Sequence, residues 1–155
     1  MEFVGRKEEL LRIKELCKKK TASLMTVQGR RRIGKSALIK HFAKTNEVAL
    51  YEFQGLAPRP RLTNKDQLRN FSSLLANYMN VKSLQLENWI QAFGQLGKLD
   101  FRKKSIVLLD EISWMGGKDP DFAGKLKEEW DRHLASNSNL ILILCGSVSS
   151  WIEKN

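Results

Sequence analysis

The residues with the clearest chemical meaning form a glycine-rich segment in the first quarter of the chain. Residues 29–36 read GRRRIGKS and match in full the phosphate-binding pattern G-x-x-x-x-G-K-[ST]. Gly29 and Gly34 let the backbone curl without a Cβ, so successive N–H groups point inward around phosphate oxygens. Lys35 supplies a point charge for the β and γ phosphates, and the Ser36 hydroxyl is placed to bind Mg²⁺. The pattern therefore predicts a site for a nucleoside triphosphate and Mg²⁺.

A pair of acidic residues at the end of an apolar run gives the second signal. Residues 106–111 read IVLLDE, which is the Walker B arrangement of a strand followed by two carboxylates. We expect Asp110 to hold Mg²⁺, through water or within the coordination sphere of Ser36. Glu111 is placed to polarise a water for in-line attack on the γ phosphate. The pair makes hydrolysis possible without proving it.

The elements that must position these residues alternate along the chain. Short apolar runs predict strands over residues 23–28, 48–53, 105–109 and 140–145. Amphipathic patterns predict helices over residues 5–19 and 34–44, on either side of the first strand. Continuously apolar strands separated by helices indicate an α/β fold with a mainly parallel sheet covered on both faces.

Three further helices are expected between the second and fourth strands. Thr63 with Asp66 resembles a capping box that opens one of them. Asp119 followed by Pro120 predicts the start of the last one. The apolar stripes of the first two are Leu68, Phe71, Leu75, Tyr78 and Met79, and then Leu86, Trp89, Ile90, Phe93 and Leu96.

Composition and charge narrow the function classes. The chain has 155 residues, 27 Lys plus Arg against 17 Asp plus Glu, and a net charge of +10. Residues 1–44 carry 13 basic and 4 acidic side chains, so almost all of the excess lies there and indicates an anionic ligand, either nucleotide phosphate or nucleic acid. Two cysteines and two histidines are too few for a disulfide framework or a zinc site. The longest apolar run, residues 140–145, is too short to span a membrane, and residues 1–20 do not read as a signal peptide, so we expect a cytoplasmic protein.

Four passages together resemble the archaeal-type ATPases, a family of the AAA+/STAND P-loop NTPases. They are FVGRKEEL at residues 3–10, GRRRIGKSALI at 29–39, LLDEISWM at 108–115 and LILCGSVSSWI at 142–152. The resemblance implies a three-layer P-loop NTPase fold with strand order 5-1-4-3-2 and ATP at the carboxyl ends of the strands. It also implies Mg-ATP binding and hydrolysis by a core that acts as a motor or a switch.

The resemblance assigns roles residue by residue. Phosphate contacts fall on residues 29–37, that is Gly29, Arg30, Arg31, Arg32, Ile33, Gly34, Lys35, Ser36 and Ala37. Adenine contacts fall on Val4, Gly5 and Arg6, the metal ligands are Ser36 and Asp110, and the catalytic residues are Glu111, Lys35 and Ser147, the last as a polar sensor of the γ phosphate. Gln54, at the end of the second strand, is placed to restrain Glu111 as a polar switch residue.

The sequence departs from the family pattern at its C-terminal end. We expect residues 1–155 to form one truncated ATPase core domain, without the fifth strand, the arginine finger, the helical lid and the C-terminal effector domain. Since an arginine finger contributes about 10³–10⁵ to turnover, the isolated chain should hydrolyse ATP slowly, and self-association or a protein partner would supply the finger. The alternative is a nucleotide-dependent binding or signalling module with negligible turnover, for which nucleic acid is a less favoured partner.

Overall fold

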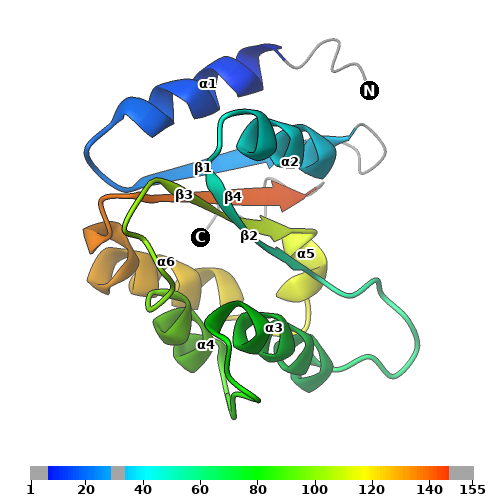
Figure 1. Ribbon diagram of the computed structural model, residues 1–155. Helices are drawn as coiled ribbons and strands as arrows, with labels where there is room; N and C mark the ends of the chain where they lie inside the picture. Colours follow the sequence, from blue (N-terminus) through cyan, green and yellow to red (C-terminus); the bar gives the residue numbers. More distant parts are fainter. Residues whose placement is uncertain (1–6, 29–33, 147–155) are drawn as a thin grey trace.

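Four parallel strands form the centre of the molecule (Figure 1). The computed structural model describes residues 7–28 and 34–146. The strands are β1 (Ser23–Gln28), β2 (Ala49–Gln54), β3 (Ser105–Asp110) and β4 (Leu140–Gly146), and their order across the sheet is β1-β4-β3-β2. The parallel α/β architecture predicted from the apolar runs is thus confirmed, as is the 1-4-3-2 part of the expected order.

Helices cover both faces of this sheet. Two of them, α1 (Lys7–Lys18) and α2 (Lys35–Thr45), lie on the upper face in Figure 1. The lower face carries the other helices, which are α3 (Asn64–Met79), α4 (Trp89–Leu96), α5 (Ile112–Met115) and α6 (Phe122–Arg132), followed by the 3₁₀ turn η2 (Leu134–Ser136). The molecule therefore has three layers.

The core consists of two apolar clusters, one on each side of the sheet. Every residue of β3 and β4 is buried, because these two strands are central and covered on both faces. Ile106 and Leu108 face the cluster under α1 and α2, whereas Val107 and Leu109 face the aromatic cluster under α3, α4 and α6. This two-sided burial explains why the strands read as unbroken apolar runs in the sequence.

The strand register brings all four carboxyl ends to one edge of the sheet. Gln28 at the end of β1 pairs with Gly146 at the end of β4. Gln54 at the end of β2 pairs with Asp110 at the end of β3. The segments that follow β1 and β3, which contain the phosphate-binding pattern and the acidic pair, consequently start from the same edge.

The predicted helix starts agree only in part with the structure. Thr63 and Asp66 form the expected capping box at the start of α3. By contrast, α4 begins only at Trp89, where Asn88 caps it, and Ile90 from the predicted stripe is 42% exposed. Asp119 does not cap α6, which begins at Phe122.

Within the described residues no helix combines the length and apolar character that crossing a membrane requires.

Candidate functional site

The junction between β1 and α2 carries the phosphate-binding pattern. Gly34 is the N-cap of α2 with φ 74° and ψ 29°, a left-handed conformation that glycine adopts without steric cost. Its carbonyl oxygen accepts the N–H of Leu38 at 2.9 Å, so the helix is closed from its first turn. Lys35, Ser36 and Ala37 form that first turn. The N–H groups and positive dipole end of an 11-residue helix therefore lie at the carboxyl edge of the sheet, which favours an anion there.

Several predicted site residues lie outside the described part of the chain. They are the phosphate-loop residues Gly29, Arg30, Arg31, Arg32 and Ile33, the adenine-contact residues Val4, Gly5 and Arg6, and the sensor residue Ser147. Ser147 directly follows Gly146, the last residue of β4. Their assigned roles remain predictions.

The acidic pair occupies the turn between β3 and α5. Asp110 is 7% exposed, and its Oδ1 accepts the N–H of Glu111 at 2.9 Å. Glu111 is 5% exposed and has φ 53° and ψ 49°, a left-handed conformation that costs a residue with a side chain roughly 1–3 kcal/mol. Its carbonyl oxygen accepts the N–H groups of Trp114 and Met115, at 3.0 and 3.1 Å. The surroundings thus hold Glu111 in a conformation that it would not adopt alone.

The oxygen donors at this edge suit Mg²⁺. A small, hard cation such as Mg²⁺ prefers one or two protein oxygen ligands together with phosphate oxygens and water. Ser36 offers a hydroxyl in the first turn of α2, and Asp110 offers a carboxylate at the end of β3. Since β1 and β3 flank β4, the two strand ends are about 10 Å apart, two strand spacings. The hydroxyl and the carboxylate thus belong to two segments at the same edge of the sheet.

Gly55, which sequence analysis missed, closes the far side of the acidic turn. Its N–H donates to the carbonyl oxygen of Asp110 at 3.0 Å. A Cβ at this position would lie 2.6 Å from the Glu111 carbonyl oxygen and 2.6 Å from the Met115 nitrogen. Both are backbone atoms and cannot swing aside. A glycine directly after a strand is the available signal for such a close approach, but it does not reveal which backbone approaches.

Replacing Gly55 with alanine is expected to destabilise the protein. The added methyl group would push the start of α5 away from the end of β2, and overpacking of this kind costs about 1–3 kcal/mol. For a chain of this size each kcal/mol lowers the melting temperature by about 2–4 °C, which calorimetry resolves.

Gly124→Ala is the matched control. Gly124 lies in α6, is exposed, and a Cβ there would have no neighbour within 4 Å. Because alanine favours helix over glycine, this variant should gain about 0.5–1 kcal/mol. Equal stability changes in the two variants would contradict the proposed contact of Gly55.

A partly buried ion pair fastens the segment between α5 and α6. Asp119 accepts the N–H of Asp121 at 2.9 Å and the Lys125 ammonium at 2.8 Å. Burial acts to raise the pKa of Asp119, but these hydrogen bonds and the charge of Lys125 outweigh it, so the pKa is lowered. The ion pair therefore stabilises the fold at pH values above the ordinary pKa of a carboxyl group. This stabilisation is lost as the pH falls through the lowered pKa of Asp119.

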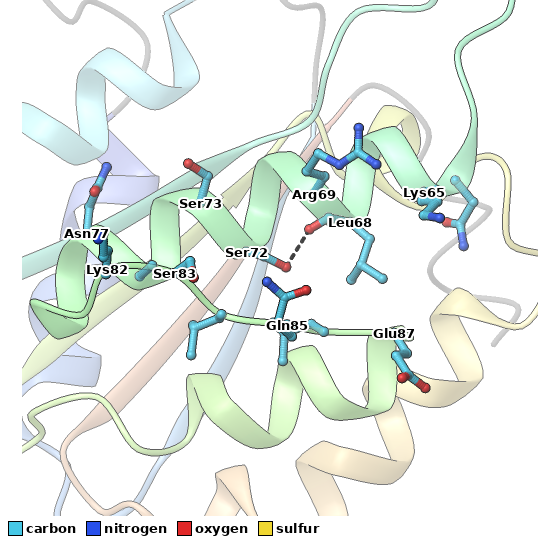
Figure 2. Close-up of a pocket in the computed structure, with 14 residues that line it drawn as sticks. Lys65, Leu68, Arg69, Ser72, Ser73, Asn77, Lys82, Ser83, Gln85 and Glu87 are labelled. Atoms are coloured by element: carbon cyan, nitrogen blue, oxygen red, sulfur yellow. Dashed lines mark hydrogen bonds between the residues drawn. The ribbon is translucent and has the colours of Figure 1, made fainter.

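A cavity of about 730 Å³ lies between α3 and the segment of residues 82–87 (Figure 2). Figure 2 shows Lys65 and Arg69 of α3 at its border and Ser72 bonded to the carbonyl oxygen of Leu68. The described residues that line the cavity include neither Ser36, Asp110 nor Glu111. The cavity is therefore separate from the carboxyl edge.

Solved ATPase structures share this fold. The chain superimposes on a Walker-type ATPase of Pyrococcus abyssi with a TM-score of 0.60 and 20% identity, over 96% of this chain and 47% of that one. It matches Cdc6p of Pyrobaculum aerophilum with a TM-score of 0.66 and 13% identity, over 98% and 41%. It matches the ORC1 protein of Aeropyrum pernix, solved in complex with DNA, with a TM-score of 0.53 and 19% identity, over 97% and 41%.

Sequence comparison gives the family. An uncharacterised protein of Methanocaldococcus jannaschii is 26% identical over 152 residues, which is 98% of this chain and 31% of that protein. The chain thus spans about a third to a half of the relatives that it matches. Residues 3–155 match the ATPase domain that occurs predominantly in Archaea. Since this match covers nearly the whole chain, the chain belongs to this family of archaeal-type ATPase domains.

Proposed function

We propose that the chain binds Mg-ATP at the carboxyl edge of its sheet and hydrolyses it to ADP and phosphate. One observation supports this most strongly, namely that the helix after GRRRIG and the buried pair Asp110–Glu111 begin at the same edge. A triphosphate seated on the start of α2 would extend toward the end of β3, since β4 alone separates β3 from β1, the strand that precedes α2. As a member of its family, the chain is an ATPase-type nucleotide-binding domain.

The phosphate contacts are proposed for residues 29–37. The backbone N–H groups of this segment would surround the phosphate oxygens, and the start of α2 adds its partial positive charge. Lys35 would bind the β and γ phosphates. Ser36 and Asp110 would hold Mg²⁺, which neutralises charge on the phosphate oxygens when it is bound. Val4, Gly5 and Arg6 are proposed to contact the adenine, and Ser147 to sense the γ phosphate.

Glu111 is proposed to orient and deprotonate the attacking water. The water oxygen forms a bond to the γ phosphorus, the bond from that phosphorus to the bridging oxygen breaks, and ADP leaves with the electron pair. The proton of the water passes to the Glu111 carboxylate. Burial of Glu111 limits the water that competes for this carboxylate.

The role of the whole protein is a further proposal. Because the chain spans only about a third to a half of its relatives, we also propose, for the whole protein, motor or switch action and self-association or a protein partner that supplies an arginine finger. Nucleic-acid binding is the alternative suggested by the basic residues 1–44 and by the ORC1 neighbour solved with DNA. If nucleic acid is bound through phosphate contacts, the affinity for duplex DNA falls steeply with salt, whereas an affinity independent of salt would dismiss this alternative.

Asp110→Asn tests the magnesium role. The asparagine keeps the shape of the side chain and an oxygen for the Glu111 N–H, but it lacks the charge that attracts the metal. We expect Mg²⁺ to stimulate ATP binding and phosphate release about 10–100-fold less in the variant than in the parent, as measured by calorimetry and a phosphate assay. Asp131→Asn, an exposed change on α6, is the control. Unchanged magnesium dependence in Asp110→Asn would remove Asp110 from the site.

A further inference from the structure

A buried glutamine of α3 binds the backbone just after β2. Gln67 is 2% exposed, although most glutamines lie at protein surfaces. Its side-chain oxygen accepts the N–H of Leu56 at 2.8 Å, and its side-chain nitrogen donates to the carbonyl oxygen of Leu56 at 2.9 Å. The amide thus pairs with Leu56 as a neighbouring strand would. The Gln67 side of both hydrogen bonds is buried and Leu56 is half-buried, so losing the bonds would leave polar groups of low exposure without these partners.

A second side chain of α3 binds the residue on the other side of Gly55. Asn70 donates from its side-chain nitrogen to the carbonyl oxygen of Gln54 at 2.9 Å. Gln67 and Asn70 are three residues apart on α3 and therefore lie on the same side of the helix. Together they hold Gln54 and Leu56, the two neighbours of Gly55.

The helix that carries these side chains is itself firmly attached to β2. The rings of Phe71 and Phe53 stack with centroids 4.5 Å apart. The Tyr78 hydroxyl accepts the N–H of Glu52 at 2.9 Å and donates to its carbonyl oxygen at 3.1 Å. Side chains of α3 therefore occupy positions along the outer edge of β2 and tie the helix to that strand.

We propose that Gln67 and Asn70 are positioning residues for Glu111. They fix the segment 54–56, so Gly55 stays in contact with the Glu111 carbonyl oxygen and with the first turn of α5. This contact, together with the hydrogen bond from Gly55 to Asp110, keeps Glu111 in its left-handed conformation. The inference rests on the proposed hydrolytic role of Glu111. It adds that side chains of α3 help to position this residue.

Kinetics of Gln67→Leu provide the first test. Leucine fills a similar volume but forms no side-chain hydrogen bonds to Leu56. The segment 54–56, which contacts the Glu111 turn, is then held less firmly. A carboxylate misplaced by a fraction of an ångström lowers turnover, and we expect kcat for ATP to fall by about tenfold or more. The dissociation constant for Mg-ATP should change less than about twofold, because α2 lies on the opposite face of the sheet (Figure 1). Asn70→Ala should act in the same direction, whereas Asn77→Ala, an exposed change on the same helix, should leave both constants unchanged.

Gln67→Glu gives a readout that a loss of packing would not produce. A protonated glutamate can accept from the Leu56 N–H and donate to the Leu56 carbonyl oxygen, as glutamine does. An ionised glutamate has no proton to donate, so its carboxylate would repel that carbonyl oxygen. Burial should raise the pKa of the introduced glutamate. The ratio of variant to parent kcat is therefore expected to rise as the pH is lowered from about 8 to about 6. A ratio that stays constant over this range would overturn the proposal.

Amide hydrogen exchange tests the positioning without requiring turnover. In Gln67→Leu, amide exchange should accelerate in residues 110–116. It should not accelerate in β1 or α2, which pack in the other core cluster, away from Gln67 and Asn70. A uniform acceleration would mean that Gln67 merely stabilises the domain, and no acceleration in residues 110–116 would mean that it does not act on the turn. Either result overturns the proposal. A parent protein that neither binds nor hydrolyses ATP would instead refute the proposed function. The exchange result would still decide whether Gln67 and Asn70 fix the turn at Glu111.

Discussion

Replacing Lys35 with alanine is expected to weaken Mg-ATP binding by about 100-fold or more. Lys35 is the first residue of α2, at the carboxyl edge of the sheet where the triphosphate is proposed to bind. Removing one partner of a buried, hydrogen-bonded charge pair costs about 2–5 kcal/mol, and each 1.4 kcal/mol is a factor of ten in affinity. Alanine is also the best helix former, so the start of α2 should remain intact. Titration calorimetry with Mg-ATP measures the effect.

The control for this variant comes from the same helix. Lys44→Ala removes an exposed lysine from the last turn of α2, far along the helix from Gly34. It changes the net charge by the same amount but should leave the affinity for Mg-ATP within about twofold, because salt screens distant exposed charges. Parental affinity in Lys35→Ala, or an equal loss in both variants, would contradict the role assigned to Lys35. A melting temperature close to that of the parent would show that the loss in affinity is not a loss of fold.

The two central strands were predictable from the sequence because they are buried on both faces. In β3 and β4 burial on two sides forces every position to be apolar, and such a run is visible without any knowledge of the fold. The α3 start was predictable for a similarly local reason, since Thr63 and Asp66 satisfy each other's backbone N–H groups. The strand order came from the family resemblance, and the structure confirms it for the four strands described.

The parts that the sequence did not predict depend on contacts that no local sequence pattern reveals. The four-residue helix α5 is too short to show an apolar period, and it exists because Glu111 adopts a left-handed conformation. Gln67 looks like an ordinary polar residue of an amphipathic helix, and its burial follows only from the position of Leu56, eleven residues earlier in the chain. Asp119 precedes a helix but bonds to Lys125 and to the turn before that helix instead of capping it.

A further set of contacts surrounds Glu111, the residue that the sequence assigned to catalysis. The sequence identifies Glu111 from a local pattern, whereas the structure shows what holds it. The contacts come from the Asp110 carboxylate, from the first turn of α5 and from Gly55. These contacts fix the backbone of Glu111, and a side chain that starts from a fixed backbone costs less to align with a water. The strained backbone of Glu111 is therefore an independent reason to test this residue for function.

Glu111→Gln is expected to lower the rate of phosphate release by about 100- to 10,000-fold while ATP binding is preserved. A glutamine keeps the size of the side chain but cannot take the proton of the attacking water, and general-base catalysis contributes about 10²–10⁴. Removing a negative charge near the phosphates should leave the affinity for Mg-ATP equal or higher. Glu128→Gln is the matched control, because Glu128 is an exposed residue of α6 that pairs with Arg132 at 2.9 Å. If phosphate release is equally slow in the parent, in Glu111→Gln and in the control while all three bind ATP, the domain is a nucleotide-dependent binding module and the hydrolytic role proposed for Glu111 fails.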